Sequence, residues 1–334
     1  MGRGGRNLWR AWGLALLLCA TSLTACGGDR PAALSAPQRK QTVAFLRAVD
    51  SGRPANQAAF LDELASAGYE KDRNLVLVGE ELAVVYPDEA SATAVVQQWV
   101  EDDVDLIVAL STVGAAAAAK AAPDIPIAFL VNDPVASGLV AEERSPEGQL
   151  TGVTFRVPAD RTLDLARRAV PHAESFGVIY PPADPAVGPL LESATDAAAT
   201  LGLTLVSAGF TGKDDIGSAV TSLRDQGAGM VWALNSPTTF RFFNEIAAAA
   251  TTAALPMLTN SASDAALLTL QPDTEELYRQ LGRQVARILG GTPVSEVPVE
   301  NPSKFLVSVN LKAADAAGIS LPADLVDQAD TVVR

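Results

Sequence analysis

The sequence contains few residues that could make or break bonds. Its single histidine, His172, follows Pro171 and precedes an apolar run, so we expect a loop or capping role for it rather than catalysis. The motifs GxSxG, GxxxxGK[ST], GxGxxG and HExxH are all absent from the sequence. The carboxylate pairs Glu80-Glu81 and Asp102-Asp103 are more typical of solvated faces than of acid–base dyads. We therefore expect no enzymatic activity, no cofactor and no metal.

Polar side chains instead gather at the ends of the apolar runs that the sequence predicts to be strands. In open parallel sheets, ligands bind beyond the carboxyl ends of the strands. The residues at those ends are therefore expected to bind a ligand: Asp50, Ser111, Thr112, Asn132, Asp133, Tyr180, Asn235, Ser236, Asn260 and Ser261.

Each of these side chains also has a purely structural alternative. Four of them could equally cap helix N-termini, namely Ser111, Thr112, Asp133 and Ser236. Capping and binding are compatible, and the segment Ser111–Thr112 is the best candidate to receive a ligand carboxylate. Tyr180 could pack at its strand end or cover a ligand ring. Asp50 could be a solvated loop acid or the counter-ion of a ligand amine.

The elements that would position these residues alternate along the chain. The first series has apolar runs at 43–46, 75–78, 106–110 and 125–131, and helical patterns at 55–67, 88–100 and 114–121. The second has runs at 152–155, 177–180, 204–206, 230–234 and 256–258, and helical patterns at 159–169, 189–201, 214–225 and 238–251. This alternation predicts an α/β fold of two Rossmann-like lobes with parallel sheets.

Turn and proline signals predict where the chain passes between the lobes. The turn Ser145-Pro146-Glu147-Gly148 marks a first crossing, and the prolines within 293–302 mark another. Between them lies a helix, Thr274–Leu289, that Gly290-Gly291 ends; a strand at 305–309 and a helix from Leu311 follow. We expect one lobe to comprise residues 41–150 and about 266–295, and the other residues 151–265 and about 296–334.

The N-terminus has the pattern of a targeting segment. Three arginines precede an apolar run at 12–20 that is too short to span a membrane comfortably. The run ends in Leu23-Thr24-Ala25-Cys26, which resembles the bacterial lipobox. We expect residues 1–25 to be a lipoprotein signal peptide, Cys26 to carry lipid, and residues 26–40 to form a flexible tether. The alternative is an ordinary signal peptide with an incidental cysteine.

The net charge and the number of cysteines limit the partners that the protein could bind and the disulfides that it could form. The 334-residue chain has a formal net charge of -14, which argues against binding nucleic acid. Residues 1–25 carry three arginines and no acid, so the remainder has a net charge of -17. A surface of that sign repels anionic headgroups, so lipid on Cys26 would have to hold the protein at the membrane. Removal of Cys19 with the signal peptide leaves no partner for a disulfide.

Several strings, in this order and spacing, resemble one family over nearly all of residues 41–334. They are Ala67-Gly68-Tyr69, Arg73-Asn74-Leu75, Ser111–Lys120, Asn132-Asp133-Pro134-Val135, Gly138-Leu139-Val140, Leu150-Thr151-Gly152-Val153-Thr154, Gly177-Val178-Ile179-Tyr180, Ile288-Leu289-Gly290-Gly291, Asn310-Leu311-Lys312 and Ala317-Gly318-Ile319. The family is that of ABC-transporter substrate-binding proteins of the tryptophan/tyrosine-type group.

This resemblance implies a type I periplasmic-binding-protein fold, in which two lobes joined by three crossings close on a small ligand. It also implies that the protein is a monomer on the outer face of the cytoplasmic membrane and that its partners are an ABC permease and the ATPase of that permease. Relatives commonly take aromatic or other apolar amino acids, so we expect an amino acid or a related small organic molecule.

The sequence departs from the family pattern at positions that would bind the charged groups of a ligand. Val113-Gly114 replaces a Thr-Pro pair, Ser236 and Asn260-Ser261 stand where acids are common, and the tyrosine often seen near Leu270 is absent. Asp50 or Asp264 could supply an acid instead, and a hydrophobic or neutral polar ligand is equally compatible with these changes.

Three other functions remain as alternatives to transport. The same fold could sense a ligand and signal to a membrane kinase or another receptor. A neighbouring kinase gene would favour sensing, whereas a neighbouring pair of permease and ATPase genes would favour transport. A hydrolase would lose turnover when His172 or a nucleophile is changed. A structural lipoprotein would have no cleft with convergent polar groups.

Overall fold

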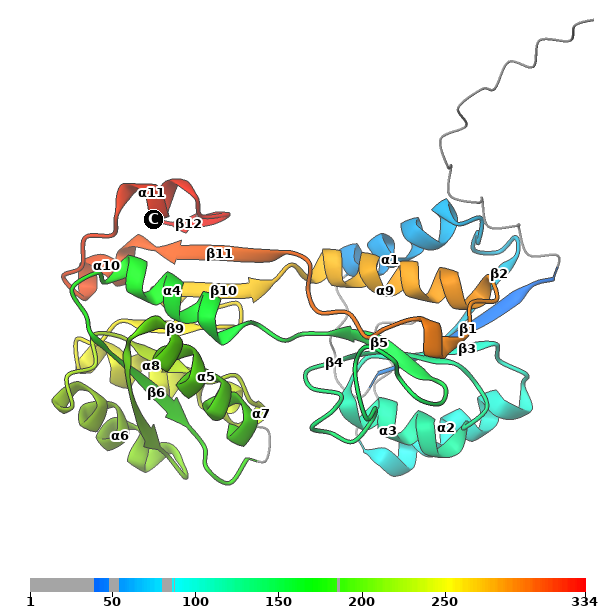
Figure 1. Ribbon diagram of the computed structural model, residues 1–334, viewed down its shortest axis with the longest axis horizontal. Coiled ribbons are helices and arrows are strands. Elements are labelled where there is room, and N and C mark those ends of the chain that lie inside the picture. The colour runs from blue at the N-terminus through cyan, green and yellow to red at the C-terminus, as the bar shows by residue number, and fades with distance from the viewer. Residues whose placement is uncertain (1–38, 48–53, 80–85, 87, 185–186) are drawn as a thin grey trace, which may run out of the picture. The chain divides into compact units, whose positions relative to one another are not determined.

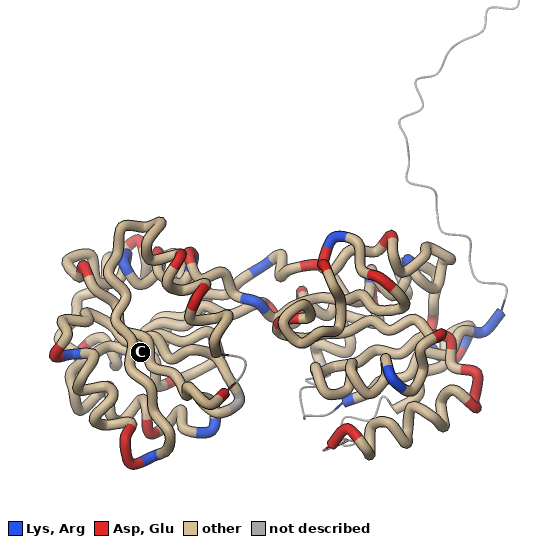
Figure 2. The backbone as a smooth tube through the Cα atoms, turned by 60° about the horizontal axis from the view of Figure 1, so that its bottom comes forward, with Lys and Arg blue, Asp and Glu red and all other residues tan. Residues whose placement is uncertain are grey.

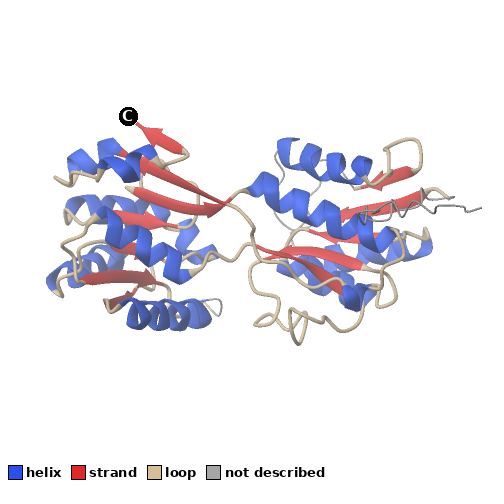
Figure 3. Cartoon of the chain, turned by 45° about the horizontal axis from the view of Figure 1, so that its top comes forward, coloured by secondary structure: helices blue, strands red, loops and turns tan. Residues whose placement is uncertain are grey.

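Two β-sheets organise the chain in the computed structural model, which describes residues 39–47, 54–79, 86, 88–184 and 187–334 (Figure 1). The first sheet has the strand order β2-β1-β3-β4-β5 and the second the order β12-β11-β10-β9-β8-β6-β7. Helices cover both faces of the sheets (Figure 3). The predicted α/β fold of two lobes with parallel sheets is confirmed.

The first sheet is wholly parallel, with strands β1 (Gln41–Leu46), β2 (Leu75–Val78), β3 (Leu106–Ala109), β4 (Ile127–Val131) and β5 (Leu150–Thr154). Its helices are α1 (Pro54–Ser66), α2 (Glu89–Glu101), α3 (Thr112–Ala121) and α9 (Thr274–Leu289). Val43 and Phe45 face one core with α1 and α9, whereas Ala44 and Leu46 face the other with α2 and α3. Because both faces are buried, β2, β3 and β4 consist entirely of apolar residues.

The second sheet is parallel except where β10 and β11 pair in antiparallel. Its strands are β6 (Ser175–Tyr180), β7 (Thr204–Gly209), β8 (Val231–Ala233), β9 (Met257–Thr259), β10 (Leu268–Pro272), β11 (Phe305–Asn310) and β12 (Thr331–Val333). Its helices are α4 (Ala159–Ala169), α5 (Val187–Leu201), α6 (Lys213–Asp225), α7 (Pro237–Arg241), α8 (Phe243–Thr252), α10 (Leu311–Ala316) and α11 (Ala323–Asp327).

Two strands lie in a different sheet from the one that the predicted lobe boundaries give them. Residues 150–154 belong to the first sheet, since β5 pairs with β4 along its whole length, and the chain leaves this sheet only at 155–158. The turn at 145–148 therefore precedes a strand of the same sheet and is not a crossing. Residues 268–272 were expected in the first lobe but form β10, which pairs with β9 and β11 of the second sheet.

Other differences from the predicted elements are local. The helix predicted at 238–251 is interrupted at Phe242, which separates α7 from α8. Strands β10 and β12 and helix α11 were not predicted from the sequence. The signal peptide, Cys26, Asp50 and all of the tether except Arg39 and Lys40 lie outside the described residues.

Polar contacts hold the segment between η1 (Val294–Glu296) and β11 against the first sheet. Gln280 Nε2 of α9 donates to Glu300 Oε2 at 2.8 Å and to the Asn301 carbonyl at 3.1 Å, and its Oε1 accepts from the Ser303 amide at 3.0 Å. Thr151 Oγ1 of β5 donates to the Val297 carbonyl at 2.6 Å. This segment, expected in the second lobe from about residue 296, therefore stays with the first sheet until shortly before β11 begins at Phe305.

Candidate functional site

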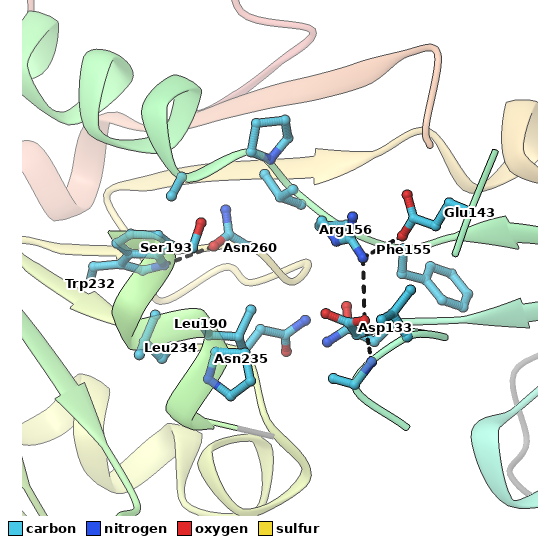
Figure 4. A pocket seen from close by; sticks show the side chains of 17 residues that line it. Asp133, Glu143, Phe155, Arg156, Leu190, Ser193, Trp232, Leu234, Asn235 and Asn260 are labelled. Atoms are coloured by element: carbon cyan, nitrogen blue, oxygen red, sulfur yellow. Dashed lines mark hydrogen bonds and ion pairs between the residues drawn. The ribbon is translucent and has the colours of Figure 1, made fainter. Parts of the chain in front are cut away.

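A cavity of about 510 Å³ lies among residues from both sheets (Figure 4). Its size falls within the roughly 300–1,000 Å³ of small-molecule sites. One wall comes from the first sheet and the segment that leaves it: Asn132, Asp133, Val135, Ala136, Glu143, Phe155, Arg156, Val157, Pro158 and Ala159 at the start of α4. The other comes from α5 and the ends of β8 and β9: Pro189, Leu190, Ser193, Trp232, Leu234, Asn235 and Asn260.

An ion cluster occupies the first wall. Arg156 follows β5, and its Nη2 lies 2.7 Å from Glu143 Oε1 and 3.4 Å from Asp133 Oδ1. Asp133 follows β4, and its Oδ1 also accepts from the Ala136 amide at 2.9 Å, so the carboxylate caps the turn that follows. All three side chains are only partly exposed, at 34% for Arg156, 35% for Asp133 and 22% for Glu143. The cluster therefore places partly desolvated charges of both signs on the cavity.

The indole of Trp232, held by a hydrogen bond, is part of the second wall. Trp232 Nε1 donates to Asn260 Oδ1 at 2.8 Å. Asn260 Nδ2 in turn donates to Thr162 Oγ1 at 3.1 Å and to the Leu270 carbonyl at 3.0 Å. Both donors of the amide are thereby used inside the protein, and Trp232 and Asn260 are 5% and 7% exposed. Asn260 therefore orients Trp232 and offers a ligand no free N–H.

Charge is distributed unequally between the two walls. Every charged side chain among the described lining residues belongs to the first wall, whereas the second wall is apolar or neutral. Figure 4 shows Asp133, Glu143 and Arg156 on one side and Trp232, Leu234, Asn235 and Asn260 on the other. Such a cavity suits a ligand with a charged end and an apolar end.

The structure brings some of the predicted site residues to this cavity. Asn132, Asp133, Asn235 and Asn260 line it. Thr112 lines an adjoining cavity of about 220 Å³ that shares Asn132, Asp133 and Leu190 with the larger one.

The remaining predicted residues lie elsewhere. Ser111 Oγ accepts from the Gly114 amide at 2.9 Å and Ser236 Oγ from the Thr239 amide at 3.1 Å, so both cap helices. Ser261 Oγ donates to Asn235 Oδ1 at 3.0 Å and so helps to orient that side chain. Tyr180 packs against the core of the second sheet and is not on the cavity wall. Neither is Asp264, whose backbone carbonyl accepts from Asn310.

Three residues of the site, Arg156, Glu143 and Trp232, were not predicted from the sequence. Arg156 stands two residues after β5, so the rule that ligands meet strand carboxyl ends would have identified it had that strand been included. Glu143 lies in a loop without a sequence signal. Trp232 is inside a strand, where an aromatic residue is expected to be core.

A second ion pair joins two of the segments that connect the sheets. Lys304 Nζ lies 2.8 Å from Asp273 Oδ2, and the Asp273 amide donates to the Lys304 carbonyl at 3.0 Å. Partial burial acts to raise the pKa of Asp273, but hydrogen bonds from Lys304 and from the Glu276 and Glu275 amides outweigh it and lower that pKa. The same bond raises the pKa of Lys304. The two segments are therefore held side by side.

Within the described ranges, no group of three or more His, Cys, Asp or Glu is placed to hold a metal ion. No helix among them is both long and apolar enough to cross a bilayer. Lys and Arg are interspersed with Asp and Glu along this part of the chain (Figure 2).

Comparison with known proteins gives a consistent family. Residues 44–333 match the family model described as ABC transporter substrate binding protein. A tyrosine-binding protein of Clostridioides difficile is 28% identical over 271 residues, which are 78% of this chain and 76% of the relative.

Two solved structures have the same fold. The ligand-free, open structure of a substrate-binding protein with adhesive properties from Clostridium difficile has a TM-score of 0.75 at 23% identity, covering 89% of this chain and 99% of that one. An ABC domain from Streptococcus pneumonia, solved in complex with L-Trp, has a TM-score of 0.69 at 22% identity, covering 88% of this chain and all of that one.

Proposed function

Because the chain belongs to the ABC transporter substrate-binding protein family, we propose that it is the solute receptor of an ABC importer. It binds an amino acid or a related small organic molecule in the cavity between its two sheets and delivers it to a membrane permease driven by an ATPase. The observation that carries this proposal is the cavity itself, which has a charged wall from one sheet and an uncharged, largely apolar wall from the other. A ligand that contacts both walls favours a closed arrangement of the lobes.

The amino-acid class rests on two supports. The cavity offers both signs of charge beside Trp232, Leu190 and Leu234, as an amino acid with an apolar or aromatic side chain requires. The relative from Clostridioides difficile carries the name tyrosine-binding protein.

Residue roles follow from the contacts. Asn132, Asp133 and Asn235 contact the ligand directly, since they line the cavity from both walls. Thr112 contributes where the smaller cavity joins the larger one. Asn260 acts through Trp232, because its amide is bonded to Trp232, Thr162 and the Leu270 carbonyl. Ser111 and Ser236 cap helices α3 and α7, and Ser261 donates a hydrogen bond that orients Asn235.

A thermal-shift screen of the purified, ligand-free protein tests the proposal. The panel contains the twenty amino acids, small peptides, sugars, nucleosides and aromatic acids. A bound ligand stabilises the folded state by mass action, and a concentration 100 times Kd contributes about 2.7 kcal/mol. We expect the largest rise in Tm with tyrosine, tryptophan, phenylalanine or a branched-chain amino acid. Folded protein that no amino acid stabilises would contradict the proposed ligand class.

Membrane attachment is a separate part of the proposal. Residues 1–25 direct export and are removed, and lipid on Cys26 anchors a monomer to the outer face of the cytoplasmic membrane, with residues 26–40 as the tether. Cells grown with an alkyne-tagged fatty acid should label the wild-type protein but not the Cys26→Ala variant. Equal labelling of both would refute the anchor, and size-exclusion chromatography with light scattering checks the monomer.

A further inference from the structure

The ion cluster on the cavity wall contains one more acid than base. Arg156 contacts both Glu143 and Asp133 through Nη2, so a single cation serves two carboxylates. The second wall adds no charge among the described residues that line the cavity. A ligand that brings an ammonium group would balance the surplus acid, whereas one that brings only a carboxylate would add to it.

The geometry of the cluster also leaves room for a carboxylate on Arg156. A guanidinium has five N–H donors in a fixed fork, and it binds carboxylates well because two of those donors can engage one group. Both ion pairs of Arg156 approach the same nitrogen, Nη2. A cation with adjacent acids is the complement of a zwitterion, whose ammonium and carboxylate are attached to one carbon.

The opposite wall determines which way such a ligand would lie. Trp232 is held by Asn260, and Leu190 and Leu234 lie on the same side of the cavity (Figure 4). Burying an apolar side chain here contributes roughly 25 cal/mol per Å². The side chain of the ligand therefore points to Trp232 and its charged groups to Arg156.

We propose that Arg156, Asp133 and Glu143 together select a zwitterionic α-amino acid, with Arg156 binding its carboxylate and the two acids its ammonium group. This inference rests on the proposed function and assigns the charge recognition of the same cavity. Arg156 thereby determines specificity, since it is the one group of the cluster that distinguishes an amino acid from the corresponding amine.

Replacing Arg156 with methionine should reverse the preference of the cavity for ligand charge. Methionine fills similar space but leaves Asp133 and Glu143 without their cation. The cavity then carries two unbalanced carboxylates, which repel a ligand carboxylate and attract an ammonium. Affinity for the amino acid should fall, while affinity for its amine should hold or increase.

Isothermal titration of the wild-type protein and variants with matched ligands tests this. The probes are L-tyrosine, tyramine and 3-(4-hydroxyphenyl)propionate, with L-leucine, isoamylamine and 4-methylpentanoate as an aliphatic series. In the wild type, the amino acid should bind most tightly and the acid most weakly. In Arg156→Met, amino-acid affinity should fall by about tenfold or more, which is the least expected for losing a hydrogen bond to a charged group, and the amine should become the tighter ligand.

Two further variants act as controls. Arg144→Met removes an exposed arginine from the Glu143 loop, off the cavity wall, and should leave the ligand order unchanged. Arg156→Lys keeps the charge without the fork, so it should retain the preference for the amino acid over the amine at reduced affinity. It also preserves the test if Arg156→Met fails to fold.

The outcomes separate this inference from the proposed function. A wild type that binds neither amino acid overturns both. A wild type that binds an amino acid, with an Arg156→Met variant of unchanged ligand order, overturns the charge assignment alone. Equal affinity of the wild type for tyrosine and 3-(4-hydroxyphenyl)propionate would also overturn it, since no acid would then be sensing the ammonium.

Discussion

Replacing Asn260 with alanine should destabilise the protein far more than its position on a cavity wall would indicate. The substitution removes an acceptor from the Trp232 indole N–H and two donors, one to Thr162 Oγ1 and one to the Leu270 carbonyl. The indole is 5% exposed and Thr162 fully buried, so water does not readily replace these bonds. A buried polar group left without a partner costs about 1–3 kcal/mol.

The matched comparison is Asn235→Ala. Asn235 lines the same cavity and is only half-buried, and its Oδ1 accepts one hydrogen bond, from Ser261 Oγ at 3.0 Å. We expect a loss of about 3 kcal/mol for Asn260→Ala and of about 1 kcal/mol or less for Asn235→Ala.

Urea unfolding of both variants measures the two losses, with the slope m checked for constancy so that midpoints can be compared. Freed from Asn260, the indole of Trp232 should also change its fluorescence maximum, which Asn235→Ala should leave in place. If the two variants lose the same free energy with the same slope, the hydrogen bonds of Asn260 do not hold the second wall.

Three further predictions concern the segments and strands around the cavity. Lys304→Met should shift acid unfolding to higher pH: because the pKa of Asp273 is lowered in the folded protein, its contribution to stability is present above its unfolded pKa of about 3.9 and is lost as pH falls through the folded value. Chemical unfolding between pH 2 and 6 checks this against Lys120→Met, whose exposed pair with Glu89 should leave the acid limb unchanged. Gly152→Ala should lower the free energy of unfolding by about 3 kcal/mol or more, because its Cβ would overlap the Phe129 carbonyl oxygen on the paired strand. Gly217→Ala on the exposed face of α6 should instead raise it by up to about 1 kcal/mol. Equal midpoints of the two variants in urea would refute this contrast. Gln280→Leu should speed amide exchange in residues 299–304 with little change in α2, since Gln280 bonds Glu300, Asn301 and Ser303; unchanged exchange there would mean that α9 does not hold this segment.

Most strands of both sheets could be predicted because helices cover both faces of each sheet. Val43 to Leu46 are all buried, in alternation on two separate cores, so the strand forms an unbroken apolar run. The helix at 274–289 was predicted to the residue, with Gly290-Gly291 as the signal for its end, and the structure shows that Asp273 caps its start.

The sheet to which a strand belongs could not be predicted in the same way. Residues 268–272 and 151–154 were each assigned to the wrong lobe, although the second segment was recognised as part of a strand. Sheet membership depends on hydrogen bonds to segments far away in the sequence, such as the pairing of Leu270 with Val307, and neither strand's own side chains specify that partner.

Only part of the site could be predicted, because the orientation of a side chain at a strand end depends on contacts that the sequence does not show. The rule of strand carboxyl ends led to Asn132, Asp133, Asn235 and Asn260, which line the cavity. It does not distinguish a side chain that faces the cavity from one used for capping, as with Ser111 and Ser236, because that depends on the local turn.

The two walls of the cavity meet in one segment, 155–158, that joins the sheets. Arg156 holds it to the loops of the first sheet through Asp133 and Glu143. At its other end, the Pro158 carbonyl accepts from Thr162 Oγ1 at 3.0 Å, and the same Thr162 oxygen accepts from Asn260, which holds Trp232. A chain of contacts thus runs from the charged wall through the connecting segment to the indole. A ligand that engages Arg156 and Trp232 together therefore acts on both ends of a connection between the sheets, which is how binding in this cavity would favour their closure.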